Sequence, residues 1–139
     1  MKIQLSYTEL QNYIAKHYYN KGLEIGHVDE KTVSVSAAVK IAMFTKSVTL
    51  NLAVERVEGT DITLAYSGGM GIDLILRGVL AFVKSQLPKY GEIVETEAAN
   101  SIVLHLGKIG QLEKVFHHLT LLGIRFAEDG IVMYGSLKS

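Results

Sequence analysis

Apolar and polar residues alternate through the first half of the chain with the period of a β-strand. The apolar members of the first run are Val33, Val35, Ala37, Val39, Ile41 and Met43. The alternation returns over residues 48–54 and, after a turn at residues 58–61, over residues 62–66. Successive side chains of a strand point to opposite faces, so this pattern indicates strands with one buried face. The short turns between them predict an antiparallel meander.

A helical pattern follows over residues 72–88. Its apolar positions recur at the spacing of one helix face: Ile72, Ile75, Leu76, Val79, Leu80, Val83 and Leu87. Further apolar residues flank this stripe, and they predict a helix that is covered on more than one side. Pro88 and Gly91 end it.

Two shorter helices and several short strands complete the expected elements. Ser6-Tyr7-Thr8-Glu9 is a capping box, which predicts a helix that reaches about Asn20. A second short helix is expected at residues 111–121. Short strands are expected at residues 23–28, 92–97 and 101–106, and Asp129-Gly130 between apolar residues predicts a terminal hairpin.

These elements predict a single α+β domain over residues 1–139. We expect one curved, mainly antiparallel sheet packed against one long apolar helix, with the two shorter helices at its edges.

Composition narrows the function classes. The chain has 14 basic and 14 acidic residues and no cysteine. The balanced charge argues against a nucleic-acid partner, and the absence of cysteine excludes disulfides and cysteine-based metal sites. No leader pattern and no apolar stretch long enough to span a bilayer is visible, so the sequence predicts a cytoplasmic protein without a transmembrane segment. Only 20% of the residues are charged. The apolar surplus must therefore fill a core, line a cavity or cover a subunit interface.

No catalytic, cofactor-binding or metal-binding motif is expected. The loop at residues 67–71, Ser-Gly-Gly-Met-Gly, fits neither a dinucleotide-binding fingerprint nor a P-loop, and it is interpreted as a hinge before the helix. The histidines are His17, His27, His105, His117 and His118, and they show no metal-ligand spacing. Each is interpreted as an ordinary core or surface histidine.

The order of elements resembles small bacterial members of the tubular lipid-binding proteins, the superfamily that includes the bactericidal/permeability-increasing fold. Residues 5–14, Leu-Ser-Tyr-Thr-Glu-Leu-Gln-Asn-Tyr-Ile, resemble the first helix of that family. Long strands at 32–44 and 47–57 precede one long apolar helix, and residues 123–135 resemble the family's terminal hairpin. The resemblance implies a helix laid against a curved sheet, an apolar ligand between them and no catalytic residues.

A ligand between the helix and the sheet would contact a defined set of side chains. The expected lining residues are Met43, Phe44, Leu50, Leu52, Leu76, Leu80 and Val83. Small residues opposite them, such as Ala37 and Ala53, leave volume for an apolar guest. We therefore expect a non-catalytic binding module for an apolar or lipid-like ligand, without a cofactor.

Two alternatives stay open. The first is a homo-oligomeric or partner-binding interaction protein with a solid core. The second is an enzyme whose site is assembled from dispersed polar residues, with His105 or His17 as the first candidates.

Overall fold

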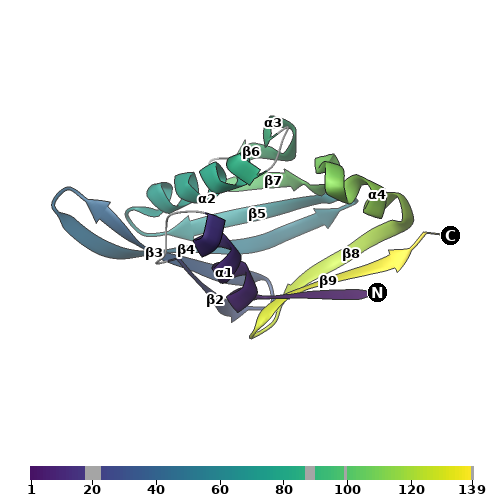
Figure 1. The fold of residues 1–139 in the computed structure, drawn as a ribbon, viewed down its shortest axis with the longest axis horizontal. Helices are drawn as coiled ribbons and strands as arrows, with labels where there is room; N and C mark the ends of the chain where they lie inside the picture. The colour runs from purple at the N-terminus through teal and green to yellow at the C-terminus, as the bar shows by residue number, and fades with distance from the viewer. Residues whose placement is uncertain (18–22, 87–89, 99, 139) are drawn as a thin grey trace.

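The structure is a computed structural model that describes residues 1–17, 23–86, 90–98 and 100–138. It is mostly β, with 56% strand and 29% helix, and its strands form two antiparallel sheets (Figure 1). The antiparallel pairing confirms the meander that the alternation predicts.

The larger sheet has six strands in the order β2-β3-β4-β5-β7-β6. Its strands are β2 (Glu24–Asp29), β3 (Thr32–Ile41), β4 (Phe44–Glu58), β5 (Asp61–Gly68), β6 (Val94–Ala98) and β7 (Ser101–His105). Along the chain, β2 to β5 pair as consecutive neighbours, because each is joined to the next by a short turn.

The smaller sheet joins the two ends of the chain. Its strand order is β1-β9-β8, so the first strand pairs with the last (Figure 1). The three strands are β1 (Lys2–Ser6), β8 (Leu119–Phe126) and β9 (Gly130–Leu137). The turn between β8 and β9 confirms the predicted terminal hairpin.

The helices are short. They are α1 (Tyr7–His17), α2 (Ile72–Gln86), α3 (Tyr90–Ile93) and α4 (Gly110–His118), with a 3₁₀ turn, η1, at Leu106–Lys108. The backbone N–H of Glu9 donates to Ser6 Oγ at 3.0 Å, which confirms the expected cap of α1. Across the described residues, no helix is long and apolar enough to cross a membrane.

The predicted fold class, one curved sheet against one long apolar helix, is wrong. The chain forms two sheets. The helix α2 has 15 residues and is not buried on every side, since Ile75 is buried whereas Leu74 is 43% exposed. The second sheet escapes prediction because β1 pairs with β9 at the other end of the chain, and because the expected helix 111–121 ends at His118. Leu119 and Leu121 belong instead to β8, where both are buried.

The core has three clusters, each centred on the six-stranded sheet. Under α2, Ile75 packs on Val35, Ala37, Val48 and Leu50 of β3 and β4. The other two clusters lie between the sheets. Tyr7 and Phe126 meet Val33 in one of them, and Phe116 and Leu121 meet Ile62 in the other.

Candidate functional site

The predicted ligand-lining residues fall into two groups. Leu50, Leu52 and Leu76 belong to the cluster under α2, where Leu50 is completely buried. Leu80 is half-buried on α2, and the side chain of Val83 lies outside the described part of the structure. Met43 and Phe44 lie elsewhere, at the far end of the β3–β4 hairpin. The structure therefore does not bring the predicted set together around one space.

The β3–β4 hairpin extends beyond its neighbours. Its register runs from Thr32↔Ala53 to Ile41↔Phe44, but β2 accompanies β3 only as far as Ser36 and β5 accompanies β4 only from Leu50. Among the described residues, the strand pairing of residues 37–48, which we call the hairpin arm, is consequently limited to the arm itself. From Leu50 to Phe44 the strand rises by roughly 20 Å. The arm is visible as the two-stranded ribbon at one end of the molecule (Figure 1).

The end of the arm is apolar and exposed. Met43 is 91% exposed and Phe44 is 76% exposed, and we call these two residues the hairpin tip. Ala42 and Met43 form the turn, and Phe44 begins β4. The turn therefore comes earlier than predicted, because the first strand was expected to end at Phe44. Ala42 has a φ of 56°, a left-handed conformation that hairpins normally give to glycine or asparagine. The chain thus has apolar residues where a solvent-exposed turn ordinarily has polar ones.

The charge of the arm is entirely positive. Residues 38–47 contain Lys40 and Lys46 and no acidic residue. Phe44 and Lys46 follow the alternation of β4, so they lie on the strand face that carries the buried Val48 and Leu50 farther along. An exposed apolar tip with a lysine directly behind it is a surface suited to an apolar layer bordered by negative charge.

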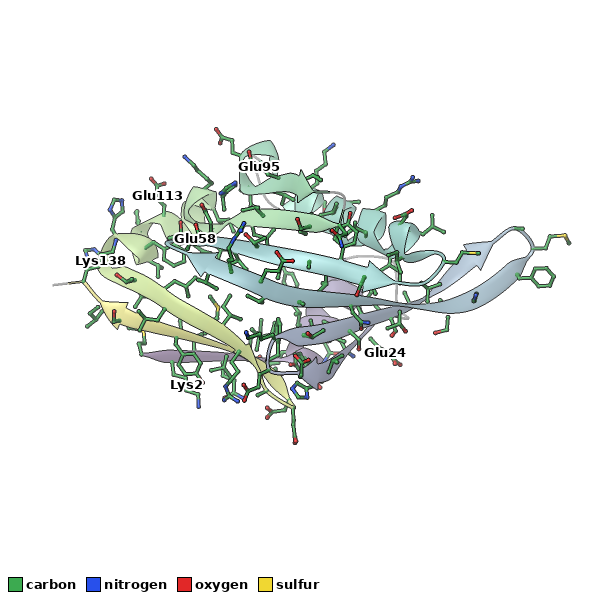
Figure 2. The ribbon with its side chains drawn as sticks, turned by 180° about the vertical axis from the view of Figure 1, so that it is seen from behind. Lys2, Glu24, Glu58, Glu95, Glu113 and Lys138 are labelled. Atoms are coloured by element: carbon green, nitrogen blue, oxygen red, sulfur yellow. The ribbon has the colours of Figure 1, made fainter. Side chains whose placement is uncertain are left out.

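A polar depression of about 510 Å³ lies on the opposite side of β5 and β7 from the core. Its polar lining comes from four adjacent strands: Arg56, Glu58, Asp61, Thr63, Glu95, Thr96 and His105. Figure 2 labels Glu58 on β4 and Glu95 on β6, which stand at the two sides of this depression. Asp61 and His105 are directly paired across β5 and β7, and this places their side chains on the same face.

His105 is held by two carboxylates. Its Nδ1 lies 2.8 Å from Asp61 Oδ1, and its Nε2 lies 2.8 Å from Glu95 Oε2. Ionised carboxylates only accept hydrogen bonds, so both ring nitrogens donate when the imidazole is protonated. Hydrogen bonds to Glu95 and then to Asp61 raise the pKa of His105, although burial opposes them. We call this arrangement the His105 clamp.

The polar side chains of the depression contact one another. Each ring nitrogen of His105 contacts a carboxylate. The neighbouring Arg56 lies 3.5 Å from Glu58 and donates to Thr63 Oγ1 at 3.4 Å. Among the described residues, no group of three or more histidine and carboxylate side chains could hold a metal ion. The cluster therefore functions best as a cross-link between strands.

The remaining histidines and the glycine-rich loop before α2 can be placed in the fold. His27 Nε2 lies 3.1 Å from the Phe126 carbonyl oxygen, and His117 and His118 are exposed on α4. The side chain of His17 is outside the described part of the structure. In the loop before α2, a Cβ on Gly68 would meet Ile72 Cγ2 at 2.5 Å and the Thr49 carbonyl oxygen at 2.7 Å. Close packing of the loop on β4 explains this glycine.

The sequence analysis missed two features, the hairpin arm and the His105 clamp, and only the arm has a signal in the strand lengths. The arm follows from strand length: β3 and β4 have 10 and 15 residues, whereas the flanking β2 and β5 have 6 and 8. Such a mismatch predicts a protruding hairpin. The His105 clamp has no comparable signal, because Asp61 and His105 are 44 residues apart and meet only through the register of β5 and β7.

Neither a protein-family model, nor a curated protein, nor a solved structure matches this chain. The resemblance to tubular lipid-binding proteins accordingly stays a prediction.

Proposed function

We propose that the protein is a non-catalytic binding module that attaches to an anionic lipid surface through the tip of the β3–β4 hairpin. The observation that carries this proposal is the exposure of Met43 and Phe44 at the end of an arm that has no neighbouring strand. It departs from the expected ligand between the sheet and α2, because Leu50, Leu52 and Leu76 pack in one cluster.

The energy available at the tip fits a weak, reversible attachment. Full burial of a methionine or phenylalanine side chain is worth about 1.5–3 kcal/mol. A lysine near an anionic membrane surface adds about 1 kcal/mol. These contributions come to on the order of 5 kcal/mol before the entropy cost of association. Attachment of this strength depends on salt and on the charge of the lipid.

Charge favours lipid over a protein partner with an apolar socket. Both lysines of the arm stand within four residues of the turn, and residues 38–47 contain no acidic residue that a negatively charged surface would repel. Lysine side chains extend along apolar surface while their ammonium groups stay in water, which suits the boundary between acyl chains and headgroups. A protein socket is the alternative, and the same experiment distinguishes it.

Co-sedimentation with vesicles tests the proposal. We expect the protein to sediment with vesicles that contain phosphatidylserine, to bind phosphatidylcholine vesicles less, and to dissociate as salt is raised. The double variant Met43→Ser and Phe44→Ser should lose binding, and Lys46→Glu should weaken it. Leu122→Ser is the matched control, since it removes an apolar side chain that is 62% exposed on β8.

Two outcomes would overturn the proposal. The first is that the unmodified protein binds neither kind of vesicle, as a module for a protein socket would. The second is that the double variant binds as well as Leu122→Ser.

A further inference from the structure

We propose that the edge of β1 pairs with β1 of a second copy, about a twofold axis at Gln4, so that two three-stranded sheets become one six-stranded sheet. This inference is independent of lipid attachment, because β1 belongs to the smaller sheet and the arm to the larger one. It rests on the hydrogen-bond phase, register and surface of β1.

The hydrogen bonds between β1 and β9 show which backbone groups of β1 point to its open edge. Met1 N donates to the Gly135 carbonyl at 2.7 Å, and Gly135 N donates back to the Met1 carbonyl at 2.9 Å. Six residues later in the same register, Tyr7 N donates to the Asp129 carbonyl. Odd-numbered residues therefore use their backbone groups on β9. The N–H and C=O groups of Lys2 and Gln4 point to the open edge.

One antiparallel register of β1 with a second copy is favoured. A twofold axis can pass through an outward-pointing residue or through the residue between two of these. An axis at Gln4 uses the outward groups of Lys2, Gln4 and Ser6 together, whereas an axis at Ile3 or Leu5 uses those of only two residues. An axis at Lys2 would place two lysines opposite each other. An axis at Ser6 would drive the second strand into α1, which Ser6 caps. At Gln4, the pairs are Gln4 with Gln4, Ile3 with Leu5 and Lys2 with Ser6, without a like-charge contact.

This pairing would cover an exposed apolar face of β1. Ile3 and Leu5 are 50% and 41% exposed, although they lie on the side of β1 that faces the core. Opposite each other across the axis, these side chains would form a continuous apolar strip between the copies. Lys2 lies on the other face of β1, where Figure 2 labels it.

The strand β1 is an edge without a bulge, whereas the other edges contain irregularities. The pairing of β1 with β9 is regular, but the pairings of β2, β6 and β8 each contain a register shift. In addition, the side chain of Gln11 accepts a hydrogen bond from Ile25 N on β2. Bulges, covering side chains, short strands and edge lysines all oppose edge pairing; β1 is short and carries Lys2, but it has no bulge.

The contact is short, so the dimer should be weak and depend on concentration. Light scattering coupled to size exclusion over a range of concentrations should show a reversible dimer. Gln4→Pro removes the outward N–H on the axis and leaves every bond to β9 in place. We expect it to weaken dimerisation roughly tenfold or more. Gln4→Thr, which keeps the N–H, should dimerise like the unmodified chain.

A cross-link keeps the test decisive if Gln4→Pro does not fold. The chain has no cysteine, so Gln4→Cys can form only an intermolecular disulfide. Paired Cα atoms at the axis would be about 5.5 Å apart, within the range of a disulfide. Gln4→Cys should oxidise to a covalent dimer much faster than Glu128→Cys, an exposed control. The proposal is overturned if the two variants cross-link equally fast, or if Gln4→Pro folds and dimerises unchanged.

Discussion

His105 ties three strands together through its two ring nitrogens. Asp61 belongs to β5, His105 to β7 and Glu95 to β6, which is the edge strand of the larger sheet. The same depression also contains the charged side chains of Arg56 and Glu58. When His105 is protonated, both carboxylates accept a hydrogen bond. When it is neutral, one ring nitrogen has no proton, and the bond to one carboxylate is lost.

The pH dependence of stability should reveal this clamp. The pKa of His105 is raised in the folded protein, so its stabilisation is fully present below the unfolded pKa of roughly 6.5 and is lost as pH rises through the folded pKa. Urea unfolding measured from mildly acidic to alkaline pH should therefore give a lower free energy of unfolding at the alkaline end. His105→Gln should remove this part of the pH dependence and destabilise mainly at acidic pH. Equal losses at both ends would contradict the clamp.

At the scale of the element, the hairpin arm combines an unfavourable turn with an unfavourable surface. An L-residue in the left-handed region costs about 1–2 kcal/mol, and Ala42 occupies it. Ala37 and Val48 pack under α2, but beyond them the arm is a two-stranded ribbon, and such a ribbon is only marginally stable in water. The arm is consequently expected to open more readily than the strands at its base.

Relief of the turn should stabilise the arm. Ala42→Gly removes the Cβ at a φ of 56°. We expect the free energy of opening of residues 38–47 to rise by about 0.5–1 kcal/mol, and their amide hydrogens to exchange more slowly. Ala38→Gly is the control, because its backbone is paired with Ser47 and gains nothing from glycine. Faster exchange in Ala42→Gly would contradict the assigned strain.

The elements also show what sequence patterns can predict. Strands β3, β4 and β5 follow directly from alternation, and Ser6 marks the start of α1, because local periodicity and capping determine them. The strand β1 does not follow, since it depends for pairing on β9 at the other end of the chain. The tip residues Met43 and Phe44 are visible in the sequence as candidates. Their exposure depends on where β2 and β5 end, and no local sequence pattern predicts these ends.

At the scale of the whole molecule, a few side chains join the two sheets. Phe126 of β8 packs with Tyr7 and with Val33 of β3, and the Tyr7 hydroxyl donates to the Ala127 carbonyl at 2.7 Å. The Phe126 N–H donates to the Glu30 carbonyl in the turn between β2 and β3. This junction fixes the smaller sheet against the larger one.

Removal of the Phe126 ring should destabilise the protein strongly. Phe126 is 6% exposed, so Phe126→Ala should lower the free energy of unfolding by about 3–5 kcal/mol. Leu122→Ala, at an exposed position on the same strand, should change it by less than about 0.5 kcal/mol. Denaturant unfolding measures both. Similar small losses in the two variants would mean that the sheets do not depend on this junction.

The pairing of the first strand with the last has a consequence during synthesis. Met1 and Gly135, which exchange hydrogen bonds, are 134 residues apart in the chain. At the usual translation speed of about 5–20 residues per second, β1 leaves the ribosome roughly 7–27 seconds before its partner exists. Throughout that interval Ile3 and Leu5 have no strand beside them. The strand β1 therefore cannot take its place in the smaller sheet until β9 has emerged.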